Sequence, residues 1–326
     1  MAHKTPTVPA DREGVARALR VLENGGLVAL PTETVYGLAA RADDAEAVAR
    51  LFSAKGRPSF NPLIVHVASL EQAAAFTDIE RRVADWRSPH GEISLGEFAT
   101  EAWGRSATLV VPLRLGAPVA REVTAGLDTI GLRLPNHPVA RAVIAGAGPL
   151  AAPSANRSGF TSPTTADHVL ATLDGRIDLV LDAGPTAAGV ESTILKLRDD
   201  GRWAILRAGP AFNEAGAPQF LAPSAEKSRQ TTIEAPGQLA RHYSPGKPVR
   251  LNAHAREDGE YLIGFGAVTG DATLSATGDV VEAARNLYAR LHEAARSDNP
   301  RIAVAPVPEQ GVGIAINDRL RRAATP

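Results

Sequence analysis

Short polar segments that could carry chemistry recur along the chain, each at the end of an apolar run with the character of a β-strand. Arg207 follows a further run of this kind. In α/β sheets, ligands collect where strand ends meet loops, so the recurring arrangement predicts one shared site. The segments are residues 31–38, 55–62 with His66 beyond them, 133–135, 153–159 and 191–193.

These segments hold cations and neutral hydrogen-bonding groups. Such a set suits an anion with several oxygens, for example a nucleotide triphosphate or an amino-acid carboxylate. The sequence has no GxxxxGK(S/T), GxGxxG, HExxH or GxSxG motif and no obvious carboxylate pair for two metals or for glycoside hydrolysis. An enzyme built on these residues would work mainly by positioning and charge stabilisation. The cations are Lys55, Arg57, Arg133 and Arg207, and the neutral groups are Thr34, Ser154, Asn156, Ser192 and Thr193.

Taken one at a time, these residues also have structural explanations. Lys55 and Arg57 follow a predicted helix, where cations stabilise the negative end of the helix dipole. His66 ends an apolar strand, and Ser154 is an ordinary turn residue. Arg133 is harder to explain structurally, because it lies in an apolar strand and a buried charge needs a partner. The functional interpretation therefore depends on the order and spacing of all the segments together.

The elements that must position these segments alternate between helix and strand, which predicts an α/β fold with a well-covered sheet. Residues 78–106 show no clean period. Helices are predicted from about Asp11 to Asn24, after a cap at Asp43 or Asp44, from a capping box of Ser69 and Gln72, and from Pro138. Strands are predicted at 27–30, 63–65, 109–111, 130–134, 150–152, 179–181, 192–195 and 203–206.

The composition changes near Ala211, where a stretch rich in Ala, Pro, Gly, Ser and Gln begins. Such a stretch is typical of an interdomain linker. A second, smaller α/β domain is predicted after it, with strands at 261–265 and 302–304, an amphipathic helix after Asp279 and a helix at 316–323. The sequence thus divides into a domain at 1–210, a linker at 211–248 and a small domain at 249–326.

The overall composition limits the classes of protein that fit. The 326 residues suggest two domains, and 44% hydrophobic with 22% charged residues is ordinary for a globular chain. A net charge of -1 argues against a constitutive nucleic-acid coat or a polybasic membrane anchor. The absence of cysteine excludes disulfides, zinc ribbons, iron–sulfur clusters and thiol nucleophiles. With no signal peptide and no membrane-spanning run, the expected location is the cytoplasm.

The first 210 or so residues resemble the YrdC-type threonylcarbamoyl-AMP synthase domain. The resemblance rests on six elements in chain order: PTETVYGL, KGRPxxxNPLxxH, IGLRLP, PSANRSG, ESTI and LRAG. Residues from about Pro248 resemble the C-terminal domain of the long members of this family, and the linker contains the similar motif RHYSP. The resemblance implies a YrdC-like twisted mixed sheet with helices, plus a smaller Rossmann-like C-terminal domain.

The resemblance also implies a reaction. Threonine combines with bicarbonate or carbon dioxide, and the new carboxylate attacks the α-phosphorus of ATP to give threonylcarbamoyl-AMP and pyrophosphate. The product would serve the threonylcarbamoyl-adenosine modification of tRNA, through downstream transfer proteins. By resemblance, threonine and its carbamate would be held by Thr34, His66, Arg133, Ser154 and Ser192. The expected ATP contacts are Arg57, Asn61, Thr129, Asn156, Thr164, Arg207, His242 and Tyr243.

Lys55 would add positive charge near the phosphates and, with Arg57, is expected to act in catalysis. Mg²⁺ would arrive with ATP rather than in a protein cage. His242 and Tyr243, on the linker, would close over the nucleotide as a lid that excludes water. One stretch, Trp103–Thr108, departs from the Trp-Pro-Gly-Pro turn that is usual in the family.

Two other functions stay open at this level. The same domain serves as a carbamoyltransferase in larger, cysteine-rich proteins, which a chain of 326 residues without cysteine does not match. An RNA-binding module is the other alternative, because the fold offers a basic concavity. The near-neutral charge favours the enzyme, and stable direct binding of tRNA is left open.

Overall fold

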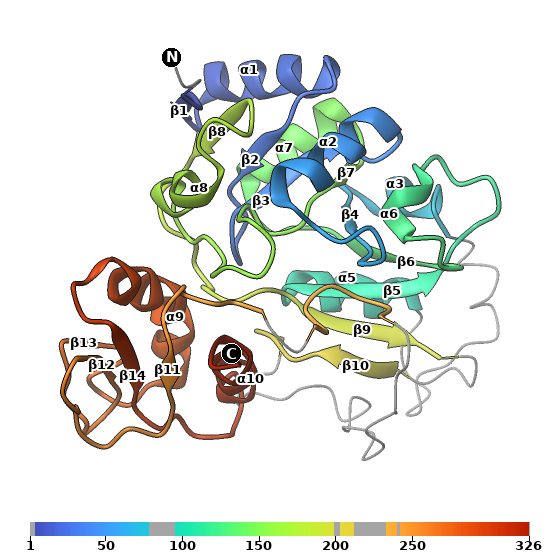
Figure 1. Ribbon diagram of the computed structural model, residues 1–326. Coiled ribbons are helices and arrows are strands. Elements are labelled where there is room, and N and C mark those ends of the chain that lie inside the picture. The colour runs from blue at the N-terminus through green and yellow to red at the C-terminus, as the bar shows by residue number, and fades with distance from the viewer. Residues whose placement is uncertain (1–3, 78–94, 199–202, 212–232, 240–241, 326) are drawn as a thin grey trace.

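The computed structural model describes residues 4–77, 95–198, 203–211, 233–239 and 242–325. Its described strands form two sheets, one of ten strands and one of four. The larger sheet belongs to the N-terminal part of the chain and the smaller one to the C-terminal part, and the two bodies lie side by side (Figure 1). The predicted α/β fold class is confirmed.

The large sheet is mixed and strongly buried. Its order is β1-β8-β2-β3-β7-β4-β6-β5-β9-β10, and several central strands expose almost nothing, because helices cover the sheet. The strands are β1 (Thr7–Pro9), β2 (Val28–Leu30), β3 (Gly37–Arg41), β4 (Ile64–His66), β5 (Ala107–Pro112), β6 (Thr129–Arg133), β7 (Leu150–Ala151), β8 (Leu179–Asp182), β9 (Thr193–Leu197) and β10 (Trp203–Arg207).

The helices of this part begin where local capping signals stand. Asp11, Asp44 and Ser69 each accept a hydrogen bond from a backbone N–H in the first turn that follows. Pro138 is the first residue of its helix, as predicted. The helices are α1 (Arg12–Glu23), α2 (Ala45–Lys55), α3 (Leu70–Ala74), α5 (Leu95–Gly104), α6 (Arg121–Thr124), α7 (Pro138–Ala147) and α8 (Ala166–Leu173).

The region without a clear period is described only from Leu95. It ends in α5, whose Trp103 is buried and donates its indole N–H to the Leu132 carbonyl at 3.3 Å. Ser106 then adopts a left-handed backbone with φ of 61°. This turn leads into β5 at the place where the family's usual Trp-Pro-Gly-Pro turn is missing.

The C-terminal part is a small parallel sheet with helices. Asp279 caps its long helix as predicted. Its carboxylate accepts hydrogen bonds from the backbone N–H groups of Val281 and Glu282 at 2.7 and 3.2 Å. The final helix begins three residues before the predicted Ile316. The sheet order is β11-β14-β12-β13, and all of its pairs are parallel. The elements are β11 (Val249–Arg250), β12 (Glu260–Gly264), β13 (Ala272–Thr273), α9 (Val280–Arg296), β14 (Arg301–Val304) and α10 (Gly313–Ala323).

The two parts meet in a close, partly apolar interface. Val35 and Val190 of the N-terminal part belong to the same apolar cluster as the inner face of α9. Gly189 lies so close to this helix that an added Cβ would stand 2.4 Å from the Cα of Arg285. Beside it, the rings of His168 on α8 and His292 on α9 stack with centroids 3.9 Å apart.

The predicted linker is described in part. Residues 212–232 and 240–241 lie outside the described residues. The described piece at 233–239 packs on the large sheet, where Ala235 joins an apolar cluster with Ile64 and Val110 and Glu234 pairs with Lys196. The division of the chain at 210 and 248 therefore stays a prediction. None of the described helices is both long enough and apolar enough to cross a membrane.

We expect the stacked histidine pair to make the protein acid-sensitive. Burial is the main cause that lowers the pKa of His168 to about 3 and that of His292 to about 4. Histidines of the unfolded chain take up protons below about pH 6.5, so folding stability decreases as the pH falls through that value. The loss at pH 5 should be roughly 1–2 kcal/mol for the pair, allowing for partial solvent screening.

Thermal unfolding at pH 7 and pH 5 checks this expectation. The double variant His168→Gln/His292→Gln should lose less stability on acidification than the wild type, whereas a variant of the exposed His254, His254→Gln, should behave like the wild type. An equal loss in the double variant and the wild type would show that other groups cause the acid sensitivity.

Candidate active site

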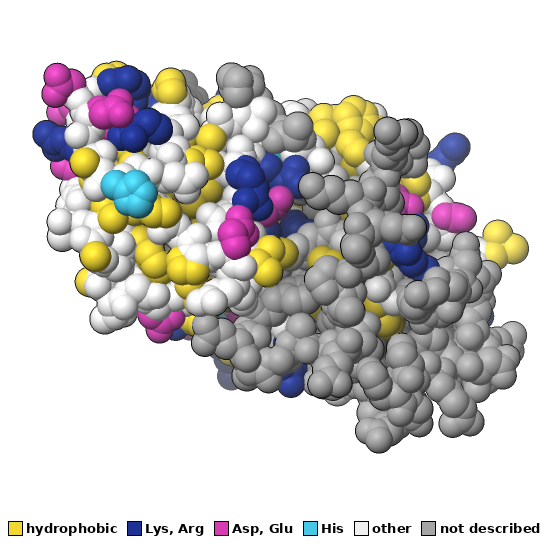
Figure 2. Space-filling view, turned by 90° about the horizontal axis from the view of Figure 1, so that it is seen from below, with side chains coloured by type: hydrophobic (Ala, Val, Ile, Leu, Met, Phe, Trp, Pro, Cys, Tyr) yellow, Lys and Arg dark blue, Asp and Glu magenta, His cyan; other side chains and the backbone are white. Residues whose placement is uncertain are grey.

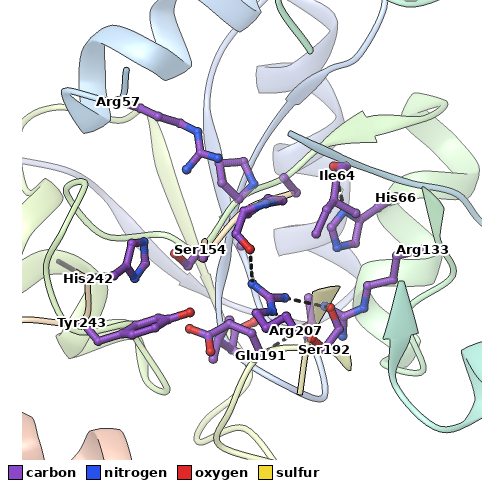
Figure 3. Close-up of a pocket in the computed structure, with 17 residues that line it drawn as sticks. Arg57, Ile64, His66, Arg133, Ser154, Glu191, Ser192, Arg207, His242 and Tyr243 are labelled. Atoms are coloured by element: carbon purple, nitrogen blue, oxygen red, sulfur yellow. Dashed lines mark hydrogen bonds between the residues drawn. The ribbon is translucent and has the colours of Figure 1, made fainter. Parts of the chain in front are cut away.

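A pocket opens where strand ends of the large sheet meet the described piece of the linker (Figure 3). It is lined by residues from each of the segments singled out in the sequence, so the predicted convergence on one site is observed. Charged side chains of both signs also gather at a recess on the face shown in Figure 2. The predicted site residues that line the pocket are Arg57, His66, Arg133, Ser154, Ser192, Arg207, His242 and Tyr243.

One end of the pocket is organised by Arg133 at the end of β6. Its Nη2 donates to Glu33 Oε1 at 2.6 Å and to the Thr34 hydroxyl at 2.8 Å. Its Nε is buried and has no partner among the described residues. Leaving a buried donor without a partner costs free energy. This Nε is therefore available to donate a hydrogen bond to a ligand.

His66 stands next to Arg133 and is uncharged. Its Nδ1 lies 3.3 Å from the Ile64 carbonyl, which makes Nδ1 the protonated nitrogen. Burial, and then the charge of Arg133, lower the pKa of His66 to about 3. At neutral pH this side chain therefore offers a hydrogen-bond acceptor at Nε2 and no charge.

The opposite end of the pocket holds two buried guanidinium groups. Arg57 donates to Asn61 Oδ1 at 2.7 Å and to the Pro62 carbonyl at 2.8 Å. Arg207 donates to the Ser192 carbonyl at 3.0 Å and to its hydroxyl at 3.1 Å. Burial and the charge of Arg207 lower the pKa of Arg57 to about 9. Within the described residues neither arginine has a carboxylate at ion-pair distance, so a polyanion is the natural counter-charge.

Two residues of the linker close this end. Tyr243 is almost fully buried and has a left-handed backbone with φ of 65°, which costs energy for a non-glycine residue. Its ring meets that of His242 edge to face at 4.0 Å, and its carbonyl accepts the Thr161 hydroxyl at 3.2 Å. Burial lowers the pKa of His242 to about 3. The tyrosine hydroxyl has no partner among the described residues, which leaves it available to a ligand.

Lys55 has a different position from the one that its predicted role needs. Its ammonium donates to the backbone carbonyls of Ser154 and Asn156, and Lys55 is not among the residues that line the pocket. Its own carbonyl accepts the N–H of Ser158 at 2.8 Å. Burial, and then the charge of Arg57, hold the pKa of Lys55 well below its ordinary value. The structure thus places Lys55 under the loop at 153–159, which it holds in shape.

The other predicted contacts lie behind the pocket wall. Thr34 accepts a hydrogen bond from Arg133, and Asn61 accepts one from Arg57. Asn156 donates to the carbonyls of Arg157 and Phe160 at 2.8 Å each. Thr164 contacts Nδ1 of His168 at 3.2 Å. Thr129 lines a smaller apolar cavity, which shares Ile64 and Pro236 with the pocket.

Sequence reasoning missed two acidic residues of the site. Glu33 pairs with Arg133, and burial would raise its pKa, but the charge of Arg133 and the hydrogen bonds to the carboxylate together outweigh burial and lower the pKa. Glu191 lines the pocket and is bound by Arg319 of the C-terminal part. Glu33 and Glu191 directly precede the predicted site residues Thr34 and Ser192, and this adjacency was the signal that the sequence offered for them. Among the described residues, no group of three His, Asp or Glu side chains could hold a metal ion.

The fold and the pocket define a two-part α/β protein with a pocket lined by buried arginines. A family model of the Sua5, YciO and YrdC proteins, described as "Telomere recombination", matches residues 20–209. A second, described as "Threonylcarbamoyl-AMP synthase, C-terminal domain", matches residues 205–325. The chain therefore belongs to the YrdC-type threonylcarbamoyl-AMP synthase family, in its long form.

Individual relatives agree over nearly the whole chain. Threonylcarbamoyl-AMP synthase of Pyrococcus abyssi is 36% identical, covering 93% of this chain and 92% of the relative. That of Bacillus subtilis is also 36% identical, covering 95% and 92%. The crystal structure of Pyrococcus abyssi Sua5 complexed with L-threonine is similar to this fold with a TM-score of 0.82, at 34% identity, covering 99% and 98%.

We expect Arg57 and Arg207, which have no carboxylate partner among the described residues, to bind inorganic pyrophosphate without a metal. At ten times its Kd the anion should stabilise the wild type by about 1.4 kcal/mol, measured as a rise in melting temperature. Arg57→Met and Arg207→Met should each remove most of this rise. Arg321→Met, which changes an exposed arginine on α10, should keep it. An undiminished rise in both pocket variants would place the anion elsewhere.

Proposed function

We propose that this chain is an L-threonylcarbamoyladenylate synthase, which converts L-threonine, bicarbonate or CO₂, and ATP into threonylcarbamoyl-AMP and pyrophosphate. The observation that carries the proposal is a single pocket with two different ends. One end has a paired arginine and an uncharged histidine, and the other has two arginines that have no carboxylate partner among the described residues. The first end fits an amino acid and the second fits a triphosphate.

Threonine binds at the Arg133 end in this proposal. The free Nε of Arg133 meets the amino-acid carboxylate, and Nε2 of His66 accepts a hydrogen bond from the amine. Thr34 holds Arg133 from the opposite side. Ser154 and Ser192 offer hydroxyls to the carbamate. The Pyrococcus abyssi relative was solved in complex with L-threonine, which supports threonine as the substrate.

ATP binds at the opposite end. Arg57 and Arg207 neutralise the phosphates, Asn61 orients Arg57, and Tyr243 with His242 closes over the nucleotide. Thr129 acts from the small apolar cavity that adjoins the pocket. Asn156 and Thr164 act from behind the wall, by shaping the loops that face the nucleotide.

The chemistry needs little from a side-chain base. Threonine and CO₂ form the N–C bond of the carbamate with loss of a proton to solvent. A carbamate oxygen then bonds to the α-phosphorus as the bond to the β-phosphate oxygen breaks, and pyrophosphate leaves. The nucleophile is already anionic, so no base has to generate it. His66 and His242 are neutral and leave the positive charge of the site to the arginines. Catalysis therefore comes from bringing two anions together between buried cations.

Mg²⁺ is best treated as part of the ATP substrate. The two acidic residues of the site, Glu33 and Glu191, are each bound by an arginine, so they do not form a protein cage. The Mg²⁺ ion would be held by the phosphates. A cytoplasmic location and transfer of the product to tRNA by downstream proteins belong to the same proposal.

Mass spectrometry of a complete reaction tests the function. Purified protein, ATP, Mg²⁺, L-threonine and bicarbonate should give a species with the mass of threonylcarbamoyl-AMP. It should disappear when either threonine or bicarbonate is omitted. A folded, ATP-binding protein that gives neither this product nor pyrophosphate would refute the synthase proposal and make RNA binding the next function to test.

The position of Lys55 leads to a separate expectation. Lys55→Met removes the donor from two backbone carbonyls of the loop that carries Ser154 and Asn156. Binding of threonine and of ATP should therefore both weaken, each by about tenfold or more. Arg50→Met, on the same helix but at the surface, is the matched control. Unchanged threonine affinity with weakened ATP affinity would instead support a direct contact of Lys55 with the phosphates.

A further inference from the structure

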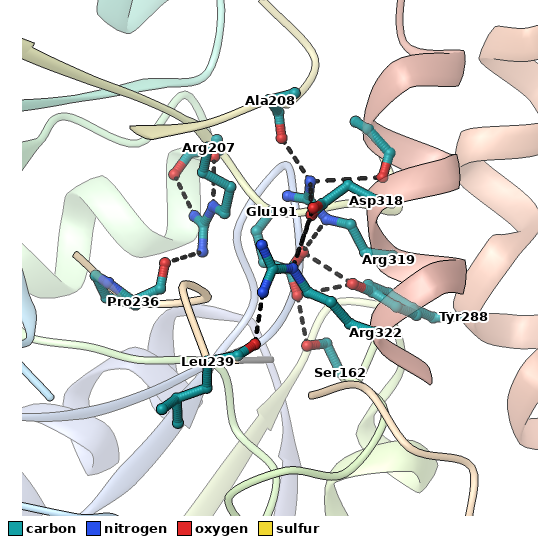
Figure 4. A network of polar contacts seen from close by, with 12 residues as sticks. Ser162, Glu191, Arg207, Ala208, Pro236, Leu239, Tyr288, Asp318, Arg319 and Arg322 are labelled. Atoms are coloured by element: carbon teal, nitrogen blue, oxygen red, sulfur yellow. Dashed lines mark hydrogen bonds and ion pairs between the residues drawn. The ribbon is translucent and has the colours of Figure 1, made fainter. Parts of the chain in front are cut away.

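Glu191 is a pocket residue whose carboxylate is held mainly from outside the N-terminal part. It precedes Ser192 at the nucleotide end and is only 5% exposed. Its oxygens accept hydrogen bonds from the Ser162 hydroxyl at 2.5 Å, from the Tyr288 hydroxyl at 3.0 and 2.9 Å, and from Arg319 Nε at 3.2 Å. Figure 4 shows these groups converging on the carboxylate. A wall of the pocket is thus built by two parts of the chain.

The two C-terminal residues are themselves fixed. Arg319 on α10 is fully buried, and its Nη1 donates to the Ala208 carbonyl at 2.6 Å. Ala208 directly follows Arg207, so the arginine of the C-terminal part is tied to the strand end that carries a pocket arginine. Tyr288 on α9 is fully buried as well.

The same two residues also contact the linker tyrosine. The guanidinium of Arg319 lies 5.7 Å from the centroid of the Tyr243 ring, and the rings of Tyr243 and Tyr288 are 5.7 Å apart. These are the distances of a cation–π contact and of an aromatic pair. Arg319 and Tyr288 therefore contact both Glu191 and Tyr243.

The loop that carries Glu191 is clamped against α9. Gly189 leaves no space for a side chain against that helix, and Arg285 Nε donates to the Ala187 carbonyl at 3.0 Å. Ala188 N–H donates to the Glu33 carbonyl at 2.8 Å, which links the loop to the opposite end of the pocket. Movement of the C-terminal part would be transmitted to this loop.

We propose that Arg319 and Tyr288 are positioning residues, through which the C-terminal part sets the nucleotide end of the pocket by holding the Glu191 carboxylate and the Tyr243 ring. Breaking a buried ion pair leaves an uncompensated charge, which is more damaging than removing both partners. A lone Glu191 carboxylate would repel the ATP phosphates and attract Arg207 away from them. The inference rests on the proposed nucleotide site.

Equilibrium binding of ATP and of threonine to full-length variants tests this proposal. Arg319→Met should weaken ATP binding by about tenfold or more and leave threonine binding within about threefold. Adding Glu191→Gln to the same chain should restore part of the ATP affinity, because the double variant no longer buries a lone charge. Tyr288→Phe keeps the ring and loses only the hydroxyl, so it should fold and weaken ATP binding by a few-fold. Arg321→Met, on the same helix, is the control and should bind ATP like the wild type.

A purely structural role predicts a different pattern. In that case Arg319→Met would lower the melting temperature while ATP affinity stayed within twofold of the control, and Tyr288→Phe would bind ATP normally. That result, or a double variant that binds ATP no better than Arg319→Met, overturns the proposal. If Arg319→Met does not fold, the Tyr288→Phe result decides. A wild type that does not bind ATP would instead refute the proposed function, and this inference with it.

Discussion

Burying arginine side chains is the constraint on which the rest of this structure depends. A guanidinium keeps its charge at neutral pH, so each buried one must find acceptors. Arg133 and Arg319 have carboxylate partners, Glu33 and Glu191. In the part of the chain that the structure describes, Arg57 and Arg207 have only carbonyl, amide and hydroxyl oxygens as acceptors. Arg133 and Arg319 thus have their counter-charge within the protein, whereas a ligand must supply the counter-charge of Arg57 and Arg207. This difference distinguishes the two ends of the pocket.

The sheet makes that arrangement possible. Its mixed order brings β4, β6, β7, β9 and β10, which are spread over residues 64–207, to one pocket. Several of the hydrogen bonds that orient the pocket side chains go to backbone carbonyls, such as those of Pro62, Ile64 and Ser192. An enzyme that works by bringing two anions together needs this rigidity more than it needs a reactive side chain. The uncharged histidines fit the same scheme, because they supply hydrogen bonds without changing the charge balance.

The C-terminal part belongs to the same physical system. Its buried Arg319 balances a carboxylate in the wall of the pocket, and its helix α9 packs against the loop that carries that carboxylate. Tyr243 of the linker lies between the two parts, in contact with Thr161 on one side and with Arg319 and Tyr288 on the other. Tyr243, Glu191 and the C-terminal part are therefore linked through shared contacts.

Local signals in the sequence determined much of this protein. Caps at Asp11, Asp44 and Asp279 fixed helix starts because a side chain bonds to the backbone only a few residues away. The ordered polar motifs predicted one convergent site, and Arg133 could be singled out because a charge in an apolar strand needs a partner. Only the tertiary structure decided that partner, Glu33, as well as the direction of Lys55 into the distant loop at 153–159 and the pairing of Glu191 with Arg319, 128 residues apart. Chain packing sets such contacts, and neither helical nor strand periodicity extends far enough along the sequence to specify them.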